Sequence, residues 1–236
     1  MVSIMNSKYS HNSTTVEPVN KNGKLRKSEL TKQAIVDAAK EFLWTRPFRE
    51  LTVRELMSAT GTSRPAFYQY FSDLHRLMEY LLEDLGNQIL AGGNPWFLDE
   101  GDPITQLGIG IDNLVKVIYE QGPVIRAIFD AAGMDEKLET AWQNFVGAFD
   151  LAVCQKIQQH QAQGLIPEFD AMQVSQALNR MDVGVTVHQF GQRPRSNPDE
   201  VGEALKRIWI QTLYGPLAAK KESHLQNPTA GSHGLN

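Results

Sequence analysis

Residues 51–71 constrain the fold of this chain more than any other stretch, because they predict two short helices joined by a tight turn. Thr52 and Glu55 form a capping box, in which each side chain satisfies a free backbone donor of the first helical turn. Gly61 stands at the turn, where a residue that tolerates positive φ is needed. Ser63 provides a second N-cap and marks the start of the second helix.

The second helix of this stretch carries polar and aromatic side chains that suit the major groove of DNA. They are Arg64, Tyr68, Gln69 and Tyr70, with Pro65 in the first turn. Phe67 and Phe71 lie four residues apart and are assigned to packing. The two helices alone leave an alternative open, an αα-hairpin that only packs within a helical protein.

The charge of the chain is unevenly distributed. The net charge is −4, yet residues 1–32 carry +4, which leaves −8 on the remainder. A basic segment beside a helix–turn–helix favours contact with DNA phosphates, and an acidic remainder discourages loose association elsewhere. Residues 1–27 are polar and lack periodicity, so we expect a disordered basic arm whose end can lie along a phosphate backbone.

The composition indicates a cytoplasmic protein. Hydrophobic residues make up 42% of the chain, but no apolar run reaches the ~18–20 residues of a membrane span. Residues 1–20 contain no apolar segment of the kind found in a secretory signal. The single cysteine, Cys154, excludes an internal disulfide and fits a reducing compartment. We therefore expect neither export nor a membrane partner.

Helical periodicity extends along most of the chain, and no segment has a convincing strand pattern. Apolar residues recur at helical spacing from Ser28 until Pro47 stops the helix. Asp73 caps a further helix, which ends at Gly92-Gly93-Asn94-Pro95. Five more helices are expected at residues 104–121, 124–132, 135–163, 170–192 and 198–219. The sequence therefore predicts an all-α protein of about nine helices, with a loose C-terminal tail at residues 220–236.

A family resemblance is carried by the run TVRELMSATGTSRPAFYQYF, at residues 52–71. This run resembles the DNA-binding signature of the TetR family of one-component transcriptional regulators, and the likeness is specific over residues 28–85. It implies an N-terminal three-helix helix–turn–helix DNA-binding domain at residues 28–72. A larger helical domain for ligand binding and dimerisation then spans residues 73–219. We expect a homodimer that binds a pseudo-palindromic operator in double-stranded DNA and dimerises through the helices at 170–192 and 198–219.

The resemblance also implies which residues lie at or near operator contacts: Thr52, Arg54, Arg64, Pro65, Tyr68 and Tyr70. Side-chain chemistry supports several of them and adds two. The hydroxyls of Thr52 and Ser63 stand at helix N-termini, where they suit phosphate. Arg64 can pair with guanine O6 and N7, Gln69 can read adenine, and a proline ring can contact a thymine methyl.

One position departs from the family pattern. The family usually places a lysine near the start of its fourth helix, where the lysine binds a phosphate. Leu74 stands at that position here, followed by His75 and Arg76. Either Arg76 replaces the lysine or this backbone contact is missing.

Catalytic motifs are not found in the sequence. The six histidines are scattered and do not form a metal-ligand spacing such as HxxxH. Cys154 lies on an apolar helix face, where a small core residue is the simpler interpretation than a nucleophile. GxGxxG, P-loop and GxSxG patterns are lacking, and Gly108 and Gly110 are interpreted as sites of close helix packing. We expect neither an enzyme nor a protein with a metal or other cofactor.

The larger domain is expected to hold a small apolar effector between its helices. Aromatic surface for this pocket comes from Trp142, Phe145, Phe149 and Trp209. The resemblance implies that Asn179 and Trp209 match an asparagine and a tryptophan that line an elongated hydrophobic pocket in similar regulators. Asp182 shares a helix face with Asn179, and we expect Asp182 to be exposed to solvent or to lie at an interface. The alternative is that all of these residues form only core or dimer interface.

These features together predict a ligand-responsive, sequence-specific DNA-binding regulator. It is expected to act as a repressor that a small apolar molecule releases from its operator. A second hypothesis from another class is a helical small-molecule carrier or interaction module with a non-functional DNA-binding head. Salt-dependent binding to one palindrome separates the two hypotheses, because a carrier has no sequence preference.

Overall fold

The computed structural model describes residues 27–98 and 101–226, and the side chains of residues 28–98 and 101–215. All regular structure in these ranges is helical, which confirms the predicted all-α class. The α-helices are α2 (Lys27–Leu43), α3 (Val53–Thr60), α4 (Arg64–Tyr68), α5 (Leu74–Ala91), α6 (Pro103–Glu120), α7 (Gly122–Ala132), α8 (Glu136–Ala162), α9 (Ala171–Phe190) and α10 (Pro198–Gln226). Two 3-10 turns are η1 (Phe48–Glu50) and η2 (Pro95–Leu98). The expected basic arm, residues 1–27, lies outside the described residues apart from Lys27.

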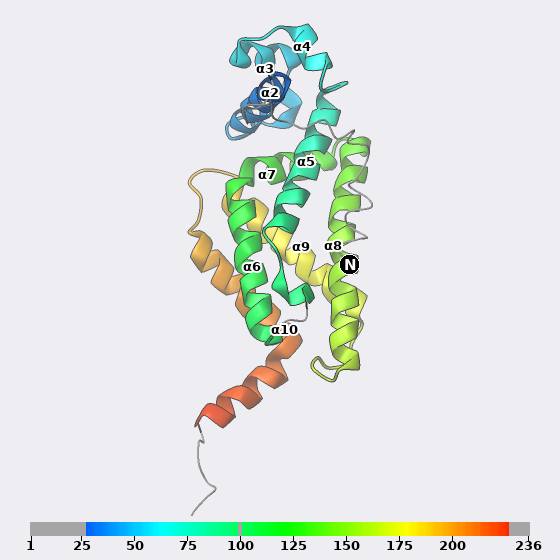
Figure 1. Ribbon diagram of the computed structural model, residues 1–236, viewed down its shortest axis with the longest axis vertical. Coiled ribbons are helices and arrows are strands. Elements are labelled where there is room, and N and C mark those ends of the chain that lie inside the picture. Colours follow the sequence, from blue (N-terminus) through cyan, green and yellow to red (C-terminus); the bar gives the residue numbers. More distant parts are fainter. Residues whose placement is uncertain (1–26, 99–100, 227–236) are drawn as a thin grey trace, which may run out of the picture.

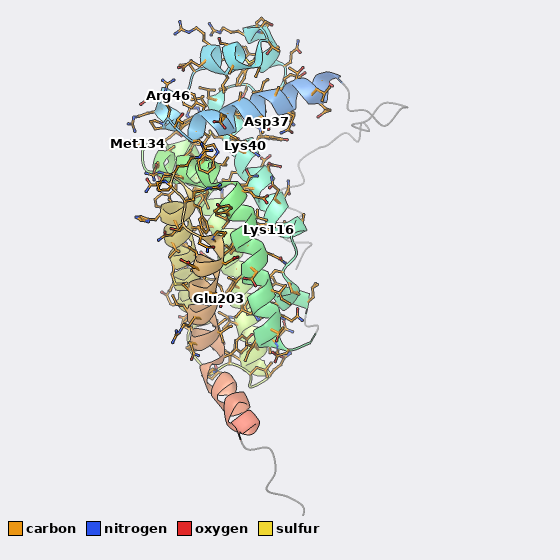
Figure 2. All side chains as sticks on the ribbon, turned by 90° about the vertical axis from the view of Figure 1, so that its left-hand side faces the viewer. Asp37, Lys40, Arg46, Lys116, Met134 and Glu203 are labelled. Atoms are coloured by element: carbon orange, nitrogen blue, oxygen red, sulfur yellow. The ribbon has the colours of Figure 1, made fainter. Side chains whose placement is uncertain are left out.

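The helices form a small head and a longer body (Figure 1). The head consists of α2, α3 and α4, and α5 runs from it into the body. There α6, α8, α9 and α10 lie along one another, while α7 lies at the end of the body nearest the head. A side view shows α2 lying across that end of the body (Figure 2).

Aspartates at N-cap positions set the start of several helices. The Asp73 carboxylate accepts the backbone N–H of Arg76 at 2.8 Å and so caps α5, as the sequence predicts. Asp170 caps α9 in the same way. Gly61 ends α3 with a φ of 66°, the left-handed conformation expected at the turn.

A compact core holds the head together. Phe67 is fully buried between the helices, together with Ile35, Leu56 and Leu77. Burial of side chains of this size contributes about 1.5–3 kcal/mol each. The assignment of Phe67 to packing is therefore confirmed, and the rest of α4 is left to face outward.

The body core confirms two further expectations. Cys154 is a buried core residue, and burial raises the pKa of its thiol. A Cβ at Gly110 would collide with the side chain of Asn94, the residue before η2, so glycine allows the close approach of α6 and this segment. At Gly108 a Cβ would make only an ordinary contact with Lys206, so close packing is found at Gly110 and not at Gly108.

Several helix ends differ from the prediction. The second helix of the helix–turn–helix, α4, ends at Tyr68, so Gln69 and Tyr70 lie just beyond it. The first helix ends at Leu43, before Pro47, because the chain enters a turn in which Arg46 N–H bonds back to the Phe42 carbonyl. The last helix continues to Gln226, so the expected loose tail does not begin at residue 220. Residues 227–236 lie outside the described residues.

The head contacts the body where α2 and η1 pack against α7, and also through two groups of side chains. Arg193 and Arg195 belong to the loop between α9 and α10. Their guanidinium carbons lie over the Trp44 ring, 4.7 and 5.1 Å from its centroid. On α5, His75 Nε2 lies within hydrogen-bond distance of the carboxylate of Asp135, the N-cap of α8, and the His75 ring packs edge-on against Phe48 of η1.

Candidate DNA-binding and ligand-binding sites

The first helix of the helix–turn–helix begins with only half of the predicted capping box. Thr52 Oγ1 accepts the backbone N–H of Glu55 at 3.2 Å, as expected. The Glu55 carboxylate is held elsewhere: it accepts the Thr52 hydroxyl at 2.8 Å and Arg46 Nη1 at 2.7 Å. Arg46 and Thr52 lower the pKa of Glu55, because both donate hydrogen bonds to its ionised form. The ion pair thus ties α3 to the turn after α2.

The second helix, α4, presents an exposed surface at the end of the molecule (Figure 1). Ser63 is its N-cap, but the Ser63 side chain makes no capping hydrogen bond. The hydroxyl therefore remains available to a phosphate. We name the exposed predicted contacts the recognition surface: Thr52, Arg54, Ser63, Arg64, Pro65, Tyr68 and Gln69. Tyr70 differs from them, because it is half-buried and packs against the core.

Charge on the recognition surface is uncompensated within the described residues. Neither Arg54 nor Arg64 enters an ion pair there. Tyr68 is 53% exposed although it is large and aromatic. Two unpaired guanidinium groups beside an exposed aromatic ring suit a polyanion with stacked bases.

The start of α5 does not present a free cation. Leu74 is half-buried against the core, and Arg76 is engaged by carboxylates of its own helix. Arg76 Nη1 lies 2.9 Å from Glu83 Oε1 and 3.2 Å from Glu79 Oε2. Arg76 must therefore leave both carboxylates before it can bind a phosphate in place of the family lysine.

Three of the predicted ligand residues form an aromatic row along α8. Trp142 and Phe145 stack with ring centroids 5.9 Å apart, and Phe145 meets Phe149 edge-on at 5.2 Å. Phe145 is buried, whereas Trp142 and Phe149 are partly exposed. Phe129 of α7, itself exposed, extends the row at 6.0 Å from Trp142.

Asn179 contacts a buried carboxylate that the sequence analysis missed. Its amide donates to Asp150 Oδ1 at 2.8 Å, and Arg180 Nη1 lies 2.8 Å from each oxygen of the same carboxylate. Asp150 is 3% exposed, so its charge is compensated inside the fold. The signal that was available is its helical spacing from the apolar residues Val146 and Val153, which places Asp150 on the buried face of α8.

Asp182 corrects one of our expectations. It is 6% exposed rather than facing solvent, because α10 packs over it and the Trp209 indole N–H bonds to both of its oxygens, at 3.0 and 3.1 Å. Burial raises the pKa of Asp182 to about 7, and the Trp209 hydrogen bond opposes that rise. Trp209, one of the predicted ligand residues, thus contacts a second buried carboxylate, that of Asp182.

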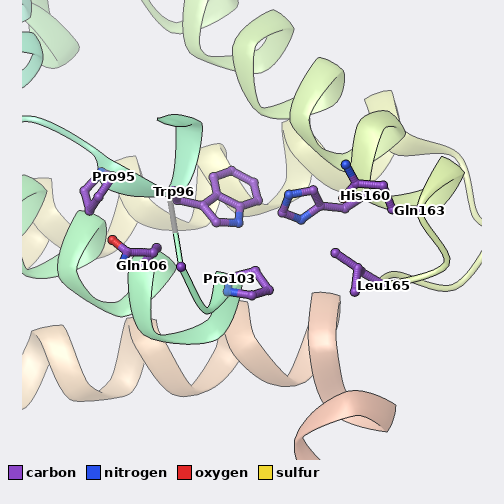
Figure 3. A pocket seen from close by; sticks show the side chains of 8 residues that line it. Pro95, Trp96, Pro103, Gln106, His160, Gln163 and Leu165 are labelled. Carbon is purple, nitrogen blue, oxygen red and sulfur yellow. The ribbon is translucent and has the colours of Figure 1, made fainter. Parts of the chain in front are cut away.

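A cavity of about 170 Å³ lies elsewhere, beside the C-terminal end of α8 (Figure 3). It is lined by Pro95, Trp96, Gly101, Pro103, Gln106, His160, Gln163 and Leu165. The Tyr214 hydroxyl lies within hydrogen-bond distance of both Trp96 Nε1 and His160 Nδ1. None of the five predicted ligand residues lines this cavity. Trp209 comes nearest, with its ring 6.3 Å from that of Trp96.

The described residues contain no group of three or more histidine, cysteine, aspartate or glutamate residues placed to hold a metal ion. No helix in the same part of the chain is long and apolar enough to cross a membrane.

The chain matches two protein families, one for the head and one for the body. Residues 35–81 match the family of bacterial regulatory proteins of the tetR type. Residues 108–215 match the C-terminal domain of the transcriptional regulator EthR.

Curated relatives match more than three quarters of the chain. The chain is 25% identical over 187 residues to the HTH-type transcriptional regulator EthR of Mycolicibacterium smegmatis, which covers 78% of this chain and 86% of that protein. EthR of Mycobacterium tuberculosis is 26% identical over 190 residues, a match that covers 77% of this chain and 86% of that protein.

Solved structures share the fold at lower identity. GusR of Salmonella enterica superposes with a TM-score of 0.63 at 16% identity, covering 80% of this chain and 98% of that one. The TetR-family regulator PfmR of Thermus thermophilus has a TM-score of 0.61 at 15% identity, covering 76% and 96%.

Proposed function

Because this chain belongs to the TetR family of transcriptional regulators and resembles EthR, we propose that it represses transcription from a pseudo-palindromic operator and leaves that operator when a small effector binds. As a DNA-binding regulator, it acts in the cytoplasm. The head reads DNA, the body holds the effector, and the body helices α9 and α10 join two copies. Each part of this proposal has its own support.

The recognition surface is the observation that carries the proposal. It brings Arg54 and Arg64 to an exposed end of the molecule without acidic partners among the described residues. In a dimer, two such surfaces about one DNA turn apart would enter successive major grooves. Arg64 and Gln69 would read base edges there, and Thr52 and Ser63 would bind phosphates.

The aromatic row of α8 supports the effector part of the proposal. Trp142, Phe145 and Phe149 offer contiguous apolar surface between helices, where bundles bind small molecules. Asn179 and Trp209 complete the proposed pocket from α9 and α10. The effector binds more tightly to the dimer state whose head spacing does not fit the operator. The ratio of its affinities for the two states sets how far it shifts the equilibrium between them.

Selection of bound sequences from random DNA tests the function directly. The expected result is one enriched palindrome, bound with an affinity that falls steeply as salt rises. A reporter gene behind that palindrome should be expressed less when the protein is present. Binding without sequence preference would reject the regulator and favour the alternative of a carrier with a non-functional head.

A further inference from the structure

Two buried carboxylates of the body have opposite surroundings. Asp150 receives the guanidinium of Arg180 and the amide of Asn179. Asp182 receives one donor, the Trp209 indole N–H, which its two oxygens share. Within the described residues, no lysine, arginine or histidine forms an ion pair with Asp182.

An ionised carboxylate can accept about four hydrogen bonds, and a buried charge is costly without a partner. One shared N–H therefore leaves most of the hydrogen bonds that the Asp182 carboxylate could accept unmade. Burial alone raises the pKa of its carboxyl, and no charged group on α6, α7, α8 or α10 contributes to that shift. Near neutral pH this carboxyl is therefore divided between its neutral and ionised forms, and a cation beside it would favour the ionised form.

The place of Asp182 connects it to the proposed effector pocket. It lies one helical turn after Asn179 on α9, and its donor Trp209 belongs to the proposed pocket. The Trp209 and Trp96 rings meet edge-on next to it. Indole rings supply apolar surface, and their faces also attract ammonium groups.

We propose, on the basis of the function proposed above, that the effector is a cationic amine with an apolar body, and that its ammonium group pairs with the carboxylate of Asp182. The apolar body lies against the aromatic side chains of the pocket. Asp150 is not used in this way because Arg180 already compensates its charge. Asp182 is thus the residue that selects the charge of the effector.

Three probes with the same eight-carbon chain test this inference on the full-length protein: octylamine, octanol and octanoate. Isothermal titration at pH 8 should give octylamine at least about tenfold tighter binding than octanol, and octanoate the weakest binding. Because the ammonium needs the ionised carboxylate, octylamine should bind about tenfold more weakly at pH 6 than at pH 8. The affinity for octanol should stay the same at both pH values.

The Asp182→Asn variant keeps an acceptor for the Trp209 N–H but removes the charge. It should bind octylamine and octanol equally and lose the pH dependence. Asp130→Asn is the matched control, because it removes a negative charge from a half-exposed side chain of α7. The control should keep the preference for the amine. The ratio of two affinities within one preparation is the readout, so a less stable variant remains informative.

The inference is overturned if octylamine binds no better than octanol, if no probe binds at millimolar concentration, or if Asp182→Asn retains the preference. Operator binding by the protein without probes is measured in parallel. Release of the operator by octanol, without a preference for the amine, would overturn this inference and leave the proposed function intact. Failure to bind any specific operator would instead reject the proposed function.

Discussion

Arg64 differs from two other arginines of the helix–turn–helix region in its surroundings. Arg46 pairs with Glu50 and Glu55, while Arg64 has no carboxylate within ion-pair distance among the described residues. It stands exposed at the first position of α4. Arg76, at the start of α5, is likewise paired with carboxylates. An unpaired guanidinium in this position fits bidentate recognition of guanine.

We predict that Arg64→Ala weakens binding to the selected operator by about 1–3 kcal/mol and relaxes the preference at one base pair in each half-site. Binding to random DNA should change much less. Fluorescence anisotropy on both DNAs measures the difference. Lys116→Ala is the control, since Lys116 lies exposed on α6, away from the head (Figure 2). Equal weakening on the two DNAs would make Arg64 a phosphate contact.

The stability of the fold should depend on pH through Asp182. Its pKa is about 7 in the folded protein but about 3.9 in an unfolded chain. Between these values the folded state binds the extra proton, so the free energy of unfolding falls as pH rises. Asp182→Asn has no such titration, so its free energy of unfolding should not fall in this way. The difference in free energy of unfolding, variant minus natural protein, should therefore be about 2 kcal/mol larger at pH 8 than at pH 5. Urea unfolding at the two pH values measures this, and parallel behaviour of both proteins would contradict it.

At the scale of helices, local sequence signals predicted most boundaries. Asp73 and Asp170 were assigned as caps because a carboxylate can accept backbone N–H groups of its own helix. Gly61 was placed at a positive φ for an equally local reason. Such interactions join residues within a few positions of each other, so periodicity and capping patterns contain them.

Contacts between helices were not predictable in the same way. Asp182 and Trp209 meet although 27 residues separate them, and Trp96 and Tyr214 meet across 118. The sequence shows that Asp182 lies on an amphipathic helix, but not that α10 packs over that part of it. Asp150 was missed for the same reason. The cavity beside Trp96 requires η2, the start of α6 and the end of α8 to converge, which no local pattern encodes.

The helices α9 and α10 are predicted to form the dimer interface, which should bury at least ~1,000 Å² in total. Ile208, 43% exposed on α10, is an apolar side chain without cover in a single chain. Ile208→Glu should therefore produce monomers at micromolar concentration, because it buries two charges in a symmetric contact. Leu151→Glu is the control, as Leu151 is similarly exposed but lies on α8. Sedimentation velocity measures the result, and a dimeric Ile208→Glu protein would place the interface elsewhere.

At the scale of the whole molecule, an effector in the body must act on DNA through contacts between body and head. The loop between α9 and α10 holds one of them, since Arg193 and Arg195 both lie over Trp44. Arg195 also donates to the carbonyl of Tyr119 at 2.7 Å and lies 3.8 Å from its ring. The head is thus linked to α6 through a single side chain.

Trp44→Ala should loosen the head without unfolding the body. Each cation–π contact contributes about 0.5–1 kcal/mol, so amides of α2 and η1 should exchange hydrogen severalfold faster, while those of α8 stay unchanged. A looser head should also tolerate operators whose half-site spacing differs by a base pair, which the natural protein should reject. Leu30→Ala is the control, because Leu30 lies exposed on α2, the helix that ends just before Trp44. Exchange rates and spacing preference that match those of the control would show that Trp44 does not fix the head. The packing of α2 and η1 on α7, and the contact of His75 with Asp135, would then be the links to test.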